Sequence, residues 1–250
     1  MTTPIFLSLV IPAYNEAARI SQTLAAADRY FSACAYDAEI IVVDDGSTDQ
    51  TKEVVTQFQQ KSGTPIHLES LPKNRGKGFA VKTGMLHRAT GKFRFFYDAD
   101  GSTPIEELDR CEALFEGRAD IIIGSRALPD SIIQQRQAWY REMMGRCFNR
   151  IERILGITAY TDTQCGFKGF SAEAAVLCFS HQSIDRFSFD AELLYIAVKH
   201  GLQIEELPVR WINSPNSKVN PLRDASRMFL DLFAIRLKDF RGVYDNKTRL

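Results

Sequence analysis

Short apolar runs alternate with longer amphipathic stretches through the first half of the chain. The apolar runs end in polar or turn residues, a pattern typical of strands buried on both faces. They lie at residues 7–14, 39–43, 66–71, 93–97 and 120–124. Because each run is followed by a helical pattern, the order predicts repeated strand–helix–strand units.

Apolar residues at helical spacing fill the intervals between these runs. Helices are predicted to open near residues 15–16, 48–49, 78 and 103. In the first interval, Ile20, Leu24 and Phe31 fall on one helix face. The last begins with a threonine and a proline, followed by Glu106, and ends at Gly117, as helices with a capping box often do.

These repeated units predict an α/β fold with a mostly parallel, doubly wound, Rossmann-like sheet flanked by helices. Ligands of such sheets bind beyond the carboxyl ends of the strands. Four polar clusters each follow a predicted strand, at residues 14–16, 44–47, 98–100 and 125–126. We therefore expect one site at that edge of the sheet.

The second half of the chain has a different pattern. We predict a basic amphipathic helix over 134–155, a loop or hairpin over 162–170, a helix over 188–200 and an amphipathic helix over 222–240. No linker, repeat or low-complexity tract separates these segments. The simplest interpretation is one domain over 1–220 with a C-terminal helical extension over 221–250.

Composition and charge exclude several classes of protein. The 31 Lys+Arg residues balance 31 Asp+Glu, so the chain lacks the positive charge of a typical nucleic-acid binder. A hydrophobic content of 45% excludes disorder as the main state. The five cysteines have no CxxC spacing, which disfavours a zinc site. Without a signal peptide or a long apolar segment, we expect a cytoplasmic protein that would meet a membrane only at its surface.

Asp98 and Asp100 carry the first candidate chemistry. Two carboxylates two positions apart at a strand end point the same way. Such oxygen ligands suit Mg²⁺ or Mn²⁺, which in turn bridge a diphosphate. A DxD pair also occurs in capping turns, so its place directly after the apolar run 93–97 is what favours the metal interpretation.

Two glycine-containing turns offer further polar groups. The turn 44–47 (DDGS) presents two carboxylates, either as capping groups or as acceptors for a base N–H or ribose hydroxyls. The segment 74–78 (NRGKG) places two cations at a helix start and is a candidate anion seat. Neither GxxxxGK[ST] nor GxGxxG is present, which disfavours P-loop and nicotinamide enzymes.

Together these motifs resemble family 2 glycosyltransferases with a GT-A fold. The segments 10–16 (VIPAYNE) and 42–49 (VVDDGSTD), with the spacing to the DxD pair, are similar to that family's signature. Within the family the chain is most similar to the polyprenyl-phosphate glycosyltransferases, in particular the dolichyl-phosphate β-glucosyltransferases. That similarity rests on 74–78, 98–103 (DADGST), 162–170 (DTQCGFKGF), 189–192 (FDAE), 208–210 and 217–218.

The resemblance implies an inverting, metal-dependent transfer of a hexose, by similarity glucose, from a UDP-sugar to dolichyl or undecaprenyl phosphate. It implies a nucleotide-sugar half over 1–125 and an acceptor half over 126–220. Asp98 and Asp100 would hold Mg²⁺ or Mn²⁺. The UDP-sugar would contact Pro12, Tyr14, Glu16, Asp44, Asp45, Gly46, Ser47, Gly76, Lys77, Asp98 and Ala99.

The resemblance also implies roles around the acceptor. The acceptor phosphate would lie against Arg126, Arg141, Arg210 and Lys218. The catalytic set would be Asp100, Arg126, Asp162 and Lys168, the last two orienting sugar or acceptor. A phosphate monoester with a second pKa of about 6 is mostly ionised at pH 7 and needs no strong protein base.

A lipid acceptor implies a peripheral protein on the cytoplasmic face of a membrane, with the basic helix 134–155 on anionic lipid. A membrane-protein partner that supplies an anchor is left open. Three alternatives also stay open. One is transfer to a hydroxyl in cell-surface polysaccharide synthesis, with Asp162, Asp190 or Glu192 as general base. The others are mannosyl transfer from GDP-mannose and a catalytically silent, membrane-recruited binding protein.

Overall fold

A seven-stranded sheet in the order β3-β2-β1-β4-β7-β5-β8 forms the centre of the molecule. The computed structural model describes residues 4–135, 137–213 and 221–245. The strands are β1 (Leu7–Ala13), β2 (Ala38–Asp44), β3 (Ile66–Ser70), β4 (Phe93–Tyr97), β5 (Ile121–Ser125), β7 (Phe167–Ser171) and β8 (Ile204–Pro208). The pairs β1–β2, β2–β3, β1–β4 and β5–β8 are parallel. The predicted α/β fold with a mostly parallel sheet is confirmed.

Strand β7 corrects the prediction of a loop or hairpin over 162–170. It lies in the middle of the sheet, antiparallel to both β4 and β5. Lys168 and Gly169 interrupt its apolar pattern, because lysine is seldom fully buried and glycine is depleted in strands. Gly169 is required by packing, since an added Cβ would come within 2.2 Å of the Phe95 ring.

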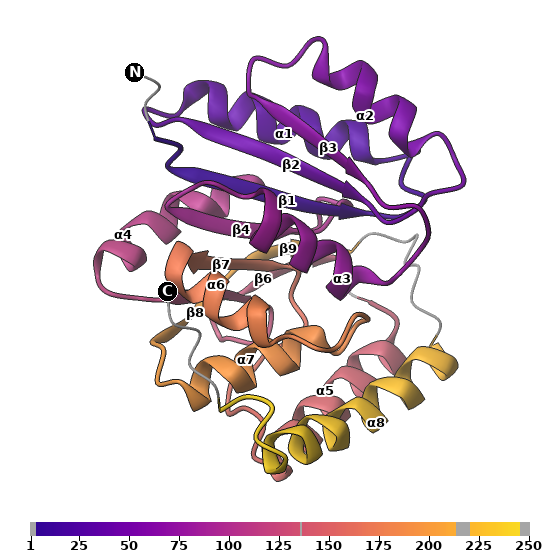
Figure 1. Ribbon diagram of the computed structural model, residues 1–250, viewed down its shortest axis with the longest axis vertical. Coiled ribbons are helices and arrows are strands. Elements are labelled where there is room, and N and C mark those ends of the chain that lie inside the picture. The colour runs from indigo at the N-terminus through magenta and orange to yellow at the C-terminus, as the bar shows by residue number, and fades with distance from the viewer. Residues whose placement is uncertain (1–3, 136, 214–220, 246–250) are drawn as a thin grey trace.

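Helices cover both faces of the sheet (Figure 1). One face carries α1 (Ile20–Ala33), α2 (Thr51–Gln59), the 3-10 helix η2 (Ile105–Arg110) and α4 (Cys111–Glu116). The other carries α3 (Lys77–Lys82), its π-helical continuation η1 (Thr83–Arg88), α6 (Ala172–His181) and α7 (Phe189–Lys199). Successive residues of β1 alternate between the two cores, with Leu9 and Ile11 in the first and Val10 in the second.

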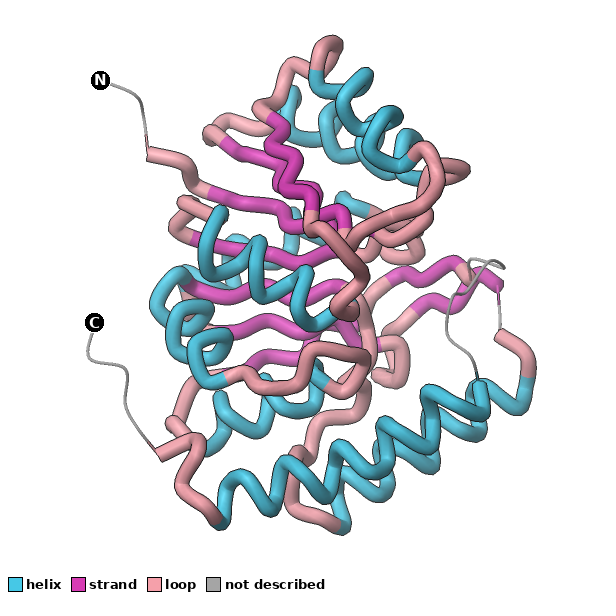
Figure 2. Tube along the Cα trace, turned by 45° about the vertical axis from the view of Figure 1, so that its right-hand side comes forward, coloured by secondary structure: helices cyan, strands magenta, loops and turns pink. Residues whose placement is uncertain are grey.

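Two long helices, α5 (Trp139–Ile154) and α8 (Pro221–Phe240), lie side by side below α7 (Figures 1 and 2). In α8, Leu232 and Ile235 are fully buried in the same core as Val10. Among the described helices, none has the length and hydropathy that crossing a membrane requires.

A separate two-stranded ribbon pairs β6 (Ile132–Gln135) with β9 (Arg210–Ile212) in parallel. Figure 2 shows it projecting from the main sheet above the paired helices. The helix predicted from residue 134 therefore begins later, at Trp139. The local sequence does not reveal β6 because its partner strand lies more than seventy positions further along the chain.

Candidate active site

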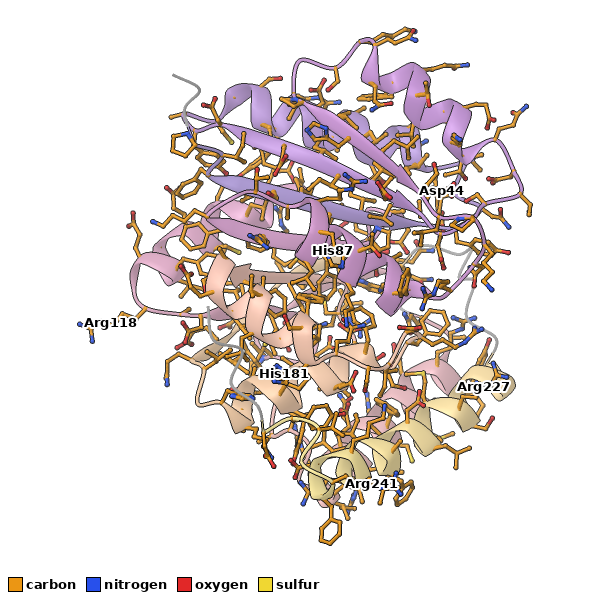
Figure 3. All side chains as sticks on the ribbon, viewed as in Figure 1. Asp44, His87, Arg118, His181, Arg227 and Arg241 are labelled. Atoms are coloured by element: carbon orange, nitrogen blue, oxygen red, sulfur yellow. The ribbon has the colours of Figure 1, made fainter. Side chains whose placement is uncertain are left out.

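The carboxyl edge of the sheet holds a pocket of about 410 Å³. Figure 3 marks this edge with Asp44, at the end of β2. The pocket is lined by nine of the residues predicted from the sequence: Pro12, Tyr14, Glu16, Asp45, Gly76, Lys77, Asp98, Ala99 and Asp100. The strand ends therefore bring together segments that are far apart in the chain, as the fold predicts.

Asp98 is held from two sides. Lys77 Nζ lies 2.6 Å from its Oδ1, and Gly166 packs directly against its carboxylate. An added Cβ at Gly166 would lie 1.9 Å from Asp98 Oδ2, so only glycine fits there. Burial alone would lower the pKa of Lys77, but Asp98 and Asp190 outweigh it and raise that pKa to about 12. Lys77 is therefore a permanent cation in this pocket.

Asp100 is the second carboxylate of the pair. Its Oδ1 accepts a hydrogen bond of 3.0 Å from the Ser102 backbone N–H, and Arg19 Nη1 lies 3.9 Å from its Oδ2. Burial, and then the charge of Asp98, raise the pKa of Asp100. A divalent cation would relieve this repulsion, and carboxylate oxygens are the ligands that Mg²⁺ and Mn²⁺ prefer. The donor set of this pocket therefore fits such an ion.

The turn 44–47 and the segment 74–78 contact each other. Asp45 accepts hydrogen bonds of 2.8 Å from the backbone N–H groups of Arg75 and Gly76. Two amides of the expected anion seat are thus occupied by a carboxylate of the chain. Asp44 Oδ1 accepts from Ser47 N at 3.0 Å and so stabilises its own turn. Neither Asp44, Gly46 nor Ser47 lines the pocket, and their assignment to nucleotide binding stays a prediction.

A second cavity, of about 490 Å³, contains the predicted acceptor residues Arg126 and Arg141 together with Asp162. Arg126 Nε and Nη2 donate to the two Asp162 oxygens at 2.6 and 2.8 Å, and its backbone N–H donates to the same carboxylate at 2.9 Å. Burial alone would raise the pKa of Asp162, but Arg126 lowers it to about 2. Burial would lower the pKa of Arg126, but Asp162 raises it, with Asp98 adding to the effect.

Of the remaining predicted residues, Lys168 and Arg210 also line neither pocket. Lys168 is fully buried and bonds to Asp190 Oδ1 at 2.5 Å and to the Cys165 carbonyl at 2.6 Å, so it supports the site from behind rather than touching a ligand. Arg210 Nε donates to Glu107 at 2.7 Å, and its assignment to the acceptor phosphate stays a prediction. Side chains alternate along β9, and its neighbour Trp211 is the one that lines the cavity. Lys218 lies outside the described residues.

Several residues that line the two pockets are not predicted from the sequence. Arg19, Arg186 and Phe187 line the first pocket, and Asn149 and Trp211 line the second. The loop that carries Arg186 follows no predicted strand, so the expectation that ligands bind beyond the carboxyl ends of strands does not point to it. Arg19 bonds to Glu16 three positions earlier, in the turn that precedes α1, and this spacing of an acidic and a basic residue is the signal for the pair in the sequence.

The doubly wound sheet, with the Asp98/Asp100 pair and an arginine-lined cavity at its carboxyl edge, agrees with the GT-A fold that the motifs predicted. The chain belongs to glycosyl transferase family 2, whose family model matches residues 8–176. It is therefore a glycosyltransferase, as the motifs predicted.

Relatives and solved structures agree with this class. Dolichyl-phosphate beta-glucosyltransferase of Dictyostelium discoideum is 34% identical over 98% of this chain and 78% of its own length. The protein of that name from Homo sapiens is 36% identical over 95% of this chain and 77% of its own length. Glucosyl-3-phosphoglycerate synthase from Mycobacterium tuberculosis, solved with Mn²⁺, UDP and glucosyl-3-phosphoglycerate, shares the fold. It has a TM-score of 0.66 and 20% identity, over 94% of this chain and 79% of that one.

Proposed function

We propose that this chain transfers glucose from UDP-glucose to a polyprenyl phosphate, with dolichyl phosphate as the acceptor. The observation that carries the proposal is the pairing of two pockets at one sheet edge, one with the Asp98/Asp100 pair and one with arginines. The names of the relatives support the sugar and the lipid, and the solved complexes of similar fold support UDP and Mn²⁺.

The first pocket would bind the donor. Asp98 and Asp100 would hold Mg²⁺ or Mn²⁺, which when bound neutralises the diphosphate and stabilises the departing UDP. Lys77, kept protonated by Asp98, adds a fixed positive charge beside that diphosphate. Tyr14 is 37% exposed at the mouth of the pocket and offers a ring face to the base.

The arginine-lined cavity would bind the acceptor phosphate. Arg126 is fixed by Asp162 in a bidentate pair, so it presents its remaining charge in one orientation. Arg141, one turn into α5, lines the same cavity. An ionised phosphate oxygen would attack the anomeric carbon opposite the departing UDP, giving a β-linked product without a protein base.

The surface of α5 supports a membrane-bound acceptor. Trp139 and Met143 are 73% and 56% exposed, on the helix whose Arg141 lines the cavity. Aromatic and apolar side chains beside arginines suit the headgroup region of an anionic bilayer. We infer that the chain binds the cytoplasmic face of a membrane through α5, which would place the cavity at the lipid headgroups.

A transfer assay tests the proposal. Purified chain with Mg²⁺ or Mn²⁺ receives UDP-glucose or GDP-mannose, and dolichyl phosphate, undecaprenyl phosphate or the unphosphorylated alcohol. We expect glucose in the lipid phase with either lipid phosphate, no product with the alcohol, and loss of activity in Asp100→Ala. Transfer to the alcohol would overturn the phosphate acceptor, transfer only from GDP-mannose would overturn the sugar, and no transfer from any donor would overturn the enzyme activity.

A further inference from the structure

The loop over residues 182–188 forms a wall of the donor pocket that no sequence motif identifies. Its Arg186 and Phe187 line the pocket. The loop is bonded to α3 through its backbone and a side chain: the Asp185 carbonyl accepts from Phe79 N at 3.0 Å, and the Gln182 side-chain Nε2 donates to the Gly78 carbonyl at 3.0 Å. The same helix begins with Lys77, the partner of Asp98.

The contact between the loop and α3 is close enough to require glycine. A Cβ at Gly76 would lie 2.5 Å from the Asp185 carbonyl oxygen, and one at Gly78 would lie 2.8 Å from that of Ile184. The glycines of the segment 74–78 thus serve this contact, and a displacement of the loop would be transmitted to Lys77.

Glu192 in α7 holds this loop in place. It is fully buried, and its Oε2 accepts from the backbone N–H groups of Ser183 and Ile184 at 3.0 and 2.8 Å. Its Oε1 accepts from the Ser183 hydroxyl and, at 2.6 Å, from the Tyr244 hydroxyl. One carboxylate therefore receives four hydrogen bonds, three of them from the loop.

Tyr244 brings the C-terminal segment into this arrangement. Its side chain is fully buried and packs against Tyr195 with ring centroids 5.9 Å apart. Burial and the neighbouring Glu192 raise the pKa of the Tyr244 hydroxyl, so it remains a donor at neutral pH. Residues after α8 thus reach a carboxylate that fixes the wall of the donor pocket.

We propose that Glu192 and Tyr244 are positioning residues for donor binding, acting through the loop 182–188 on Arg186, Phe187 and Lys77. This inference rests on the proposed function, because it takes the first pocket to be the UDP-sugar site. It assigns the C-terminal segment a part in nucleotide affinity, although that segment lies outside the pocket.

Tyr244→Phe is the principal test, because it removes one hydroxyl and keeps the ring. Tyr195→Phe is the matched control: its hydroxyl accepts from Arg236 at 2.7 Å in the same packed region, and this hydrogen bond does not involve the loop. Amide hydrogen exchange over 182–188, UDP affinity by calorimetry and the KM values for UDP-glucose and lipid phosphate are measured for both. For Tyr244→Phe we expect faster exchange and a five- to tenfold weaker UDP affinity and higher donor KM. Its acceptor KM should stay within twofold, and Tyr195→Phe should match the unsubstituted chain.

Glu192→Gln and Glu192→Leu separate positioning from folding. A glutamine keeps an oxygen for the two backbone donors and offers an NH₂ to the two hydroxyls, so we expect it to retain most of the UDP affinity. Leucine keeps the volume and loses every hydrogen bond, so we expect at least the effect of Tyr244→Phe at temperatures where circular dichroism shows a folded chain.

Three outcomes would overturn the inference: unchanged exchange in Tyr244→Phe, faster exchange with unchanged UDP affinity, or equal effects of Tyr195→Phe. Absence of glucose transfer by the unsubstituted chain would instead overturn the proposed function, while exchange and UDP affinity would still report on the loop.

Discussion

Replacing Gly166 with alanine should separate the position of Asp98 from the stability of the fold. The new Cβ would lie 1.9 Å from Asp98 Oδ2, and ordinary contact begins at 3.4 Å, so the carboxylate would have to move by about 1.5 Å. Gly166 cannot easily withdraw, because its carbonyl accepts from Asp98 N at 3.1 Å. Its φ is not left-handed, so alanine adds no backbone strain. The perturbation is therefore confined to the carboxylate.

A displacement of about 1 Å in a positioned group costs on the order of 100-fold in rate. We expect Gly166→Ala to lower kcat/KM for UDP-glucose by at least that factor and to raise the metal concentration needed for half-maximal activity. The assay is a metal titration of steady-state transfer, with thermal unfolding measured in parallel. Gly63→Ala is the control, since its Cβ would meet Ser32 Oγ at an ordinary 3.6 Å. A folded Gly166→Ala variant with activity and metal dependence equal to the control would refute the assigned role of Asp98.

Three further results are expected. Burial raises the pKa of Glu152 to about 8 from 4.5, so between these pH values the folded state holds one proton more than the unfolded state, and the free energy of unfolding falls by roughly 1.4 kcal/mol per pH unit as pH rises. Glu152→Gln should abolish this slope in urea unfolding, and an unchanged slope would contradict the raised pKa of Glu152. Asp162→Asn should lower the free energy of unfolding by about 2–4 kcal/mol, because it leaves Arg126 without its bidentate partner; a loss below 0.5 kcal/mol would show that the pair does not stabilise the fold. Arg141→Ala should raise the lipid-phosphate KM by about tenfold. Arg210→Ala should leave it unchanged, because Arg210 pairs with Glu107; an equal rise in both variants would instead support the assignment of both arginines made from the sequence.

The sequence predicts the first five sheet strands well because each is a short apolar run closed by a turn. The remaining strands depend on pairing with segments far away in the sequence. Strand β7 contains a buried lysine and a glycine that are acceptable only because Asp190 pairs with Lys168 and the Phe95 ring covers Gly169. No local pattern contains that information.

In the site too, local motifs predict some residues and long-range contacts place the others. Residues that follow β1, β2 and β4 meet in the first pocket because parallel strands share a carboxyl edge, whereas Arg126, which follows β5, lines the second. Asp45 shows what the motif does not reveal: it lines the pocket and also holds the segment 74–78 through two backbone amides. Arg186 and Phe187 reach the pocket from a loop whose position depends on Glu192, a contact that only the folded chain displays.

Following labelled glucose from UDP-glucose into dolichyl phosphate, with the anomeric configuration of the product determined by NMR, tests the proposed transfer itself. We predict a divalent-metal-dependent, β-linked glucosyl phosphate lipid that Asp100→Ala does not make. An α-linked product, or equal incorporation by Asp100→Ala or in the presence of a metal chelator, would contradict it.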